Sequence, residues 1–68
     1  MIKVRNVNRY AMNFKYIIAR YLDSRWWFYG AWNDYNDAAE AALDLNYRSH
    51  CAGYWAFALE NCECEWRD

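Results

Sequence analysis

The sequence predicts an α+β fold: an antiparallel β-sheet of three to four strands in ββαβ order, with one helix packed on one face. Two neighbouring segments, residues 15–22 and 26–32, alternate in character and are rich in aromatic and β-branched side chains, as strands are. An alanine-rich segment at 35–45 has helical spacing, and another alternating segment follows at 54–60. A chain of 68 residues is short enough that we expect a single α+β domain over residues 1–68.

Residues 1–13 are weakly patterned. Ile2 and Val4 suit the start of an edge strand, whereas the asparagines of this segment favour turns. The segment is therefore expected to be either a short strand or an extended arm.

The strands at 15–22 and 26–32 are expected to form a hairpin. The polar run Asp23-Ser24-Arg25 interrupts the alternation, and a two-residue loop there makes a tight turn, although the favoured Asn-Gly or Asp-Gly pair is absent. If Leu22 faces Arg25, the register that follows sets these residues opposite each other: Arg20 and Trp27, Ile18 and Tyr29, Tyr16 and Ala31.

This register gives the hairpin two different faces. The first face contains Tyr16, Ile18, Arg20, Leu22, Trp27, Tyr29 and Ala31. The second face contains Ile17, Ala19, Tyr21, Trp26, Phe28, Gly30 and Trp32. Because the second face carries no charge apart from Lys15 at its end, we expect the helix to pack there and the first face to meet a partner.

The helix is expected over residues 35–45. Asp34 is a good N-cap, Asp37 adds negative charge to the first turn, and Asn46 suits the C-terminal stop. One helical face is formed by Tyr35, Ala38, Ala39, Ala42 and Leu45. Small alanines allow a close approach to a sheet that carries large rings, which favours a well-packed interface.

The C-terminal part is expected to supply one or two more strands. Residues 54–60 alternate as a third strand, with a short helix over 52–60 as the competing interpretation. Cys62, Cys64 and Trp66 then alternate with two glutamates, as in a short amphipathic edge strand.

The aromatic content predicts a binding surface. The chain holds five tryptophans, seven tyrosines and three phenylalanines, and each such ring buries about 150–250 Å². This is more ring surface than one helix on one sheet hides, so part of it is expected to serve oligomerisation or a partner protein. The contact residues expected on the sheet are Tyr16, Arg20, Trp27 and Tyr29.

The charged residues leave two interpretations open. Asp37, Glu40 and Asp44 form an acidic stripe on the helix, which is either a further contact site for a partner or an ordinary solvated helix face. Most of the lysine and arginine lies in residues 1–25 and most of the aspartate and glutamate in residues 26–68. This asymmetry indicates either a charged partner or two halves that neutralise each other across the fold.

Nothing in the sequence favours catalysis. His50, Cys51, Cys62 and Cys64 match a Cys3His zinc complement in number, but their spacing is unlike that of known sites, and burial as small thiols explains the cysteines equally well. His50 and Cys51 are adjacent, so on an extended chain they point apart and do not suit a Cys–His nucleophile. We expect a protein that is not an enzyme and that has no metal and no cofactor.

The location expected from the sequence is the cytoplasm. Three cysteines do not complete an intramolecular disulfide framework. The first residues lack the apolar region of a signal peptide, and no apolar run approaches the roughly 18 residues of a membrane span. Reduced thiols and no membrane association are therefore expected.

The order of hairpin, alanine-rich helix and strand, with Trp32-Asn33-Asp34 leading into residues 38–42, resembles the plan of small bacteriophage accessory proteins that act in host takeover. The resemblance covers about residues 14–60. It implies a phage-encoded inhibitor that works in the host bacterial cytoplasm by binding a host protein, such as RNA polymerase, a nuclease or an anti-phage defence complex.

Two other functions compete with that of a protein inhibitor. The first is a single-stranded nucleic-acid-binding module, because rings stack on bases while Arg20 and Arg25 are suited to phosphates. The second is a virion or assembly component, which would form large oligomers. The slightly negative net charge of -1 favours the protein partner over nucleic acid.

Overall fold

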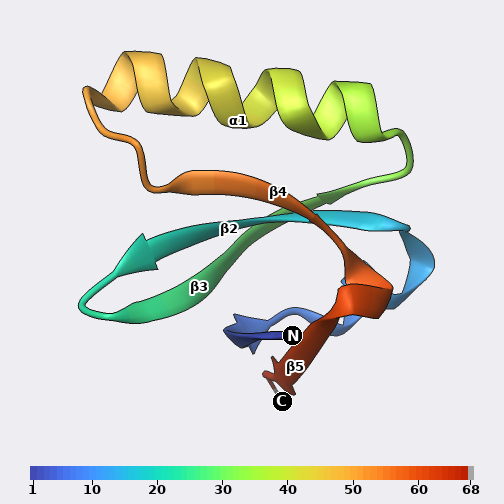
Figure 1. Ribbon diagram of the computed structural model, residues 1–68. Coiled ribbons are helices and arrows are strands. Elements are labelled where there is room, and N and C mark those ends of the chain that lie inside the picture. Colours follow the sequence, from blue (N-terminus) through green and yellow to red (C-terminus); the bar gives the residue numbers. More distant parts are fainter. Residues whose placement is uncertain (68) are drawn as a thin grey trace.

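The computed structural model describes residues 1–67, which form one five-stranded mixed sheet with a long helix on it (Figure 1). The strands are β1 (Ile2–Val7), β2 (Tyr16–Leu22), β3 (Arg25–Trp32), β4 (Tyr54–Ala58) and β5 (Cys62–Trp66). The helix is α1 (Tyr35–Ser49), and two short 3-10 helices are η1 (Arg9–Asn13) and η2 (Leu59–Asn61). The predicted α+β class is confirmed at this level.

The sheet differs in detail from the predicted ββαβ arrangement. Its strand order is β4-β2-β3-β1-β5, with β2 antiparallel to β3 and β4, and with β1 parallel to β3 and β5. The prediction of three to four antiparallel strands is therefore wrong in strand number and in strand direction. The short strand that was one of the two expectations for residues 1–13 is present as β1, but it lies in the interior of the sheet between β3 and β5 and not at an edge.

The hairpin of β2 and β3 has the predicted tight turn. Asp23 and Ser24 have φ values of 54° and 64°, which is the conformation of a type I′ turn. Leu22 pairs with Arg25, as the sequence predicted, and the next cross-strand pair on that face also follows the predicted register.

Beyond the first half of the hairpin, a bulge changes the register. Ala19 pairs with Phe28 while Ile18 pairs with Gly30, so Tyr29 is the extra residue on β3. The predicted pairs of Ile18 with Tyr29 and of Tyr16 with Ala31 are therefore wrong, since the observed partners are Gly30 and Trp32. A bulge inverts the alternation beyond it, so Gly30 and Trp32 lie on the same face as Ile18.

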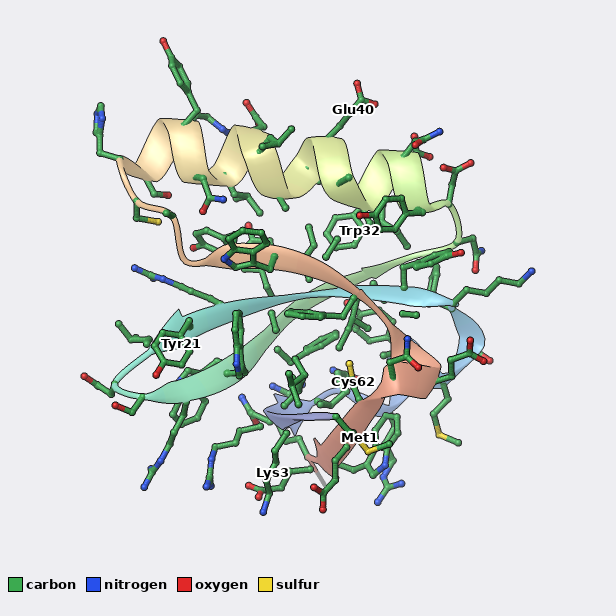
Figure 2. All side chains as sticks on the ribbon, in the orientation of Figure 1. Met1, Lys3, Tyr21, Trp32, Glu40 and Cys62 are labelled. Atoms are coloured by element: carbon green, nitrogen blue, oxygen red, sulfur yellow. The ribbon has the colours of Figure 1, made fainter. Side chains whose placement is uncertain are left out.

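The helix covers the face of Ile18, and the prediction that it covers the uncharged second face is wrong. Ile18, Ala42 and Tyr54 form a buried cluster, and Figure 2 shows Trp32 pointing toward the underside of α1. Partly buried residues complete this cluster: Trp32, Ala41, Leu45 and Cys51. Small residues of α1 meet the large rings of the sheet here, as predicted, but on the opposite face.

The uncharged face is covered by the two ends of the chain. The sheet curls so that β1, η1 and β5 lie on the side away from α1 (Figure 1). Five residues that are 0% exposed form the inner cluster: Val4, Val7, Ala11, Ile17 and Ala19. The rings of Trp26, Phe28, Phe57 and Trp66 pack around it. On a strongly curled sheet, other strands of the same sheet can cover an apolar face. The absence of charge on the second face therefore did not show where the helix packs.

The start of α1 is as predicted, but its end is not. Asp34 Oδ1 accepts hydrogen bonds from the backbone N–H groups of Asn36 (2.8 Å) and Asp37 (3.4 Å). The helix continues past Asn46 to Ser49 and stops at His50, which has a left-handed φ of 53°. Asn46 is therefore not the stop.

The side chain of Asn46 instead joins α1 to the start of β4. Its Nδ2 donates to the carbonyl oxygen of Tyr54 at 2.9 Å, and its Oδ1 accepts from the Tyr54 N–H at 2.8 Å. The segment after this junction is the strand β4 rather than the competing helix, and β5 is an edge strand as expected.

Candidate functional site

The sheet face that contains Ile18 also carries an indole between two guanidinium groups. Trp27 on β3 is in register with Arg20 on β2 and with Arg5 on β1. Cross-strand partners in register share a face of the sheet, so these residues form a line across three strands. We call them the Arg20–Trp27–Arg5 row. Trp27 is partly exposed, and its Nε1 donates to the backbone oxygen of Leu22 at 3.1 Å, which fixes the plane of the indole.

A hollow of about 240 Å³ lies beside Trp27. It is lined by Arg5, Asn6, Trp27, Glu65, Trp66 and Arg67. The hollow lies where β1 is irregular, because the pairing of β1 with β5 shifts between Val4 and Val7. Asn6 takes a left-handed φ of 60° at this point, a conformation that asparagine tolerates better than most residues. The backbone kink thus places a polar depression at one end of the row.

Both signs of charge meet at this depression. Glu65 lies 3.5 Å from the Arg5 guanidinium and 3.6 Å from the Lys3 ammonium. Cations of the N-terminal part thus pair with an acidic residue of the C-terminal part, which supports the interpretation that the halves neutralise each other. Exposed pairs of this kind add little stability, about 0–1 kcal/mol, so their main effect is to orient the side chains.

At the other end of the row, Tyr54 holds two side chains in place. The Arg20 guanidinium lies over the Tyr54 ring, 5.3 Å from the centroid, and the Tyr29 ring meets the same ring edge-on at 5.3 Å. Tyr54 is 8% exposed, whereas Tyr29 remains 51% exposed. A buried ring therefore supports a partly exposed arginine and an exposed tyrosine.

The structure brings three of the four predicted sheet residues together. Arg20 is the cross-strand partner of Trp27, and Arg20 and Tyr29 share the Tyr54 ring. Tyr16 lies apart at the opposite end of β2, where its ring meets Tyr35 of the helix at 5.6 Å. Tyr16 therefore belongs to the helix–sheet interface and not to the row.

Sequence reasoning missed Arg5 and the hollow. The sequence feature that could have identified Arg5 is the alternation of Lys3 and Arg5 with Val4. In a strand, this alternation places the two cations on one side and the valine on the other. The kink at Asn6 has no such signal, because an asparagine in a weakly patterned segment suits a turn equally well.

The acidic stripe of the helix is separate from the row. Asp37, Glu40 and Asp44 are all exposed, and Figure 2 shows Glu40 pointing away from the sheet. Asp44 forms an ion pair with Arg48 at 2.8 Å, one helical turn along. The stripe therefore forms a solvated outer face, and any contact it makes is independent of the row.

The residues of the alternative zinc set lie on two sides of the sheet. Cys51 packs in the cluster beneath α1, while Cys62 and Cys64 pack in the inner cluster. Within residues 1–67, no group of three or more His, Cys, Asp or Glu side chains is arranged to hold a metal ion. The Cys51 Sγ lies 3.7 Å from Asn46 Oδ1, to which it donates.

The two thiols of β5 are held in their protonated form. Burial, reinforced by the neighbouring Cys64, raises the pKa of Cys62 to about 11, and burial also raises the pKa of Cys64. The Cys62 thiol donates to the backbone oxygen of Ala58 at 3.4 Å. Since the thiolate is the reactive form, these cysteines serve packing better than nucleophilic chemistry.

A second exposed apolar region flanks the outer edge of β4. A hollow of about 640 Å³ on one side is lined by Tyr21, Trp26, Ala52, Gly53, Trp55 and Phe57. A hollow of about 240 Å³ on the helix side is lined by Tyr35, Ala39, Ala42, Leu43, Asn46, Tyr54, Trp55 and Ala56. Trp55 borders both hollows and is 55% exposed. The sequence assigned no role to this region.

The helix α1 is neither long enough nor apolar enough to cross a membrane, and it is the one α-helix in residues 1–67. Comparisons with protein-family models, curated proteins and solved structures find no match for this chain. The resemblance to small phage accessory proteins therefore stays a prediction.

Proposed function

We propose that the chain is a non-catalytic binding domain that holds a protein partner on the Arg20–Trp27–Arg5 row. The observation that carries the proposal is the partly exposed indole of Trp27, which is fixed by a hydrogen bond and flanked by two arginines in register on the neighbouring strands. Tryptophan, tyrosine and arginine are the residues that most often dominate the binding energy of protein interfaces.

The surroundings of the row favour a protein partner. Tyr54 restrains Arg20 and Tyr29 before any partner arrives, so less side-chain entropy is lost on binding. The hollow beside Trp27 offers Arg5 and Arg67 together with Glu65, which suits a polar side chain of either charge. Such a mixed lining is more typical of the rim of a protein interface than of a phosphate-binding groove.

The cysteine contacts support a binding role over a catalytic one. Cys51 donates to Asn46 rather than to its neighbour His50, and the thiols of Cys62 and Cys64 have raised pKa values. From the resemblance, the partner is a host protein and the outcome is its inhibition in the host cytoplasm, as the sequence predicted.

The experiment is affinity capture followed by measurement with the purified partner. The wild-type chain and the Trp27→Ala variant are immobilised, and proteins retained by the first but not by the second are identified by mass spectrometry. With the purified partner, Trp27→Ala is expected to lower affinity by roughly 30-fold, which is about 2 kcal/mol at an anchor residue.

Tyr47→Ala is the matched control, because Tyr47 is 82% exposed on the helix and lies outside the row. It should retain the partner at wild-type affinity, and circular dichroism should show all three proteins folded. A partner that binds wild type and Trp27→Ala equally well would refute the proposed surface.

Single-stranded nucleic acid is the second candidate for the same row. An indole between two guanidinium groups is chemically suited to stack on a base and contact phosphates. The Glu65 carboxylate beside Lys3 and Arg5 opposes this, since it offsets cations that phosphates would need. Binding of a single-stranded oligonucleotide that falls steeply with salt and is lost in Trp27→Ala would favour this candidate over the protein partner.

A further inference from the structure

We propose that two copies of this chain associate through the outer edge of β4, antiparallel to each other, with Ala56 of one copy opposite Ala56 of the other. Backbone pairing between the two copies is confined to Ala56, because Asn46 already occupies the outward groups of Tyr54. The contact uses the outer edge of β4 and none of the three residues of the Arg20–Trp27–Arg5 row, so the proposal does not depend on the function proposed above. Backbone, side chains and charge each support it.

The first support is the direction of the backbone groups of β4. This strand is the last in the sheet order, and Tyr54 directs its N–H and C=O away from β2, to the side chain of Asn46. Gly53, in contrast, accepts from the Tyr21 N–H on β2 at 2.8 Å. Because directions alternate along an antiparallel strand, Ala56 and Ala58 also direct their groups outward.

Part of this edge is already hydrogen-bonded within the chain. Asn46 satisfies both groups of Tyr54, and the Cys62 thiol donates to the Ala58 oxygen. Residues 1–67 provide no hydrogen bond for the outward N–H and C=O of Ala56. In a two-fold antiparallel pair, an outward-facing residue on the axis exchanges both hydrogen bonds with its own copy. The unpaired groups thus lie where self-pairing uses them.

The second support is the fit of the side chains next to Ala56. In this register Trp55 of one copy is opposite Phe57 of the other, in the non-hydrogen-bonded pairs whose side chains approach most closely. Trp55 is 55% exposed and borders the larger hollow. Each copy thus adds a ring next to the exposed indole of its partner.

The helices extend the same contact. Leu43 is 70% exposed and borders the smaller hollow together with Trp55 and Ala56 of β4. Tyr47, one helical turn later, is 82% exposed. The two-fold axis that pairs the strands brings the two α1 helices alongside each other above the sheet, where Leu43 of each is covered.

The third support is charge. None of the residues lining either hollow is charged, so the part of the contact that the hollows form brings no like charges together. Edge strands of monomers are commonly protected by lysine, proline or a bulge. The sequence of β4, Tyr-Trp-Ala-Phe-Ala, has no charge and no proline, and its pairing with β2 is regular. The apolar middle of this edge, between Asn46 at Tyr54 and the Cys62 thiol at Ala58, fits a second copy of itself.

The test is the mass of the purified chain in solution, measured by sedimentation velocity over a range of concentrations. The wild type is expected to approach twice its monomer mass of 8.3 kDa as concentration rises. Trp55→Lys places like charges at the contact and should weaken the dimer by at least about 30-fold. Ala56→Pro removes the central donor while leaving the pairing with β2 intact, and should weaken it similarly.

Two further variants keep the result decisive. Leu43→Lys changes an exposed helix residue, so it should fold even where a strand variant fails, and it should also shift the chain to monomer. Met12→Ala removes an apolar side chain of similar exposure, 63%, on η1 and outside both hollows, and should leave the dimer unchanged. A wild type that stays monomeric at all concentrations, or a dimer that tolerates Leu43→Lys and Trp55→Lys, would overturn the proposal.

Discussion

At the scale of single residues, Asn46 shows how a side chain can replace a strand. Its amide donates to and accepts from the same residue, Tyr54, as a neighbouring β-strand would. This pair of hydrogen bonds fixes where β4 begins relative to α1. The sequence suggested a helix stop at Asn46 because asparagine is common at helix ends, and its actual role depends on a residue eight positions later.

We predict that Asn46→Ala lowers the free energy of unfolding by about 1–3 kcal/mol, because it leaves the N–H and C=O of Tyr54 without partners at a partly buried position. Urea unfolding followed by circular dichroism measures the change. Asn36→Ala is the matched control: Asn36 is an exposed helix residue, and its replacement should cost close to nothing. Equal stability of the two variants would show that the two hydrogen bonds between Asn46 and Tyr54 contribute nothing to stability.

At the scale of elements, the hairpin was predictable in its first half only. The polar turn at Asp23 and Ser24 and the pair of Leu22 with Arg25 follow from local sequence. The bulge at Tyr29 does not, because one extra residue leaves the composition of a strand unchanged while moving every later side chain to the other face. This single event put Trp32 on the face of Ile18, under α1.

The bulge brings Trp32 close to Gly30, and this contact gives an element-scale prediction. A Cβ at position 30 would lie 3.0 Å from Cη2 and 3.1 Å from Cζ3 of the Trp32 indole. Gly30→Ala must therefore displace a ring that packs against the helix, and we expect a loss of about 1–3 kcal/mol in the free energy of unfolding.

A double-mutant cycle in urea separates this contact from a general effect of alanine in β3. In a Trp32→Leu background the ring is absent, so Gly30→Ala should cost clearly less than it does in the wild type. The same cost in both backgrounds would mean that the contact between Gly30 and Trp32 is not the cause.

At the scale of the whole molecule, the sequence predicted the α+β class but not how the two faces are covered. The parallel pairing of β1 with β3 and β5 joins the first residues of the chain to the last, and no local pattern encodes such long-range pairing. The candidate site shows the same limit. Arg20, Trp27 and Tyr29 were visible in the hairpin, whereas Arg5 entered the row only through the long-range position of β1.

Closure of the inner cluster by β5 also links global stability to pH. The pKa of Cys62 is raised from its ordinary value of 9.0 to about 11 in the folded chain, chiefly by burial. Between these values the thiol ionises in the unfolded chain but stays protonated in the folded chain, so the unfolded chain binds fewer protons. The contribution of Cys62 to the free energy of unfolding is therefore fully present below about pH 9, and it is lost as the pH rises toward 11.

We expect the free energy of unfolding of the wild type to fall faster between pH 9 and 11 than that of Cys62→Ala, measured by urea unfolding at each pH. Both proteins contain the same other ionisable residues, so the difference between the two curves reports Cys62 together with its interaction with Cys64. That difference should be constant below pH 9 and should shrink above it. A difference that stays constant up to pH 11 would show that β5 does not hold Cys62 in its protonated form when it closes the curled sheet.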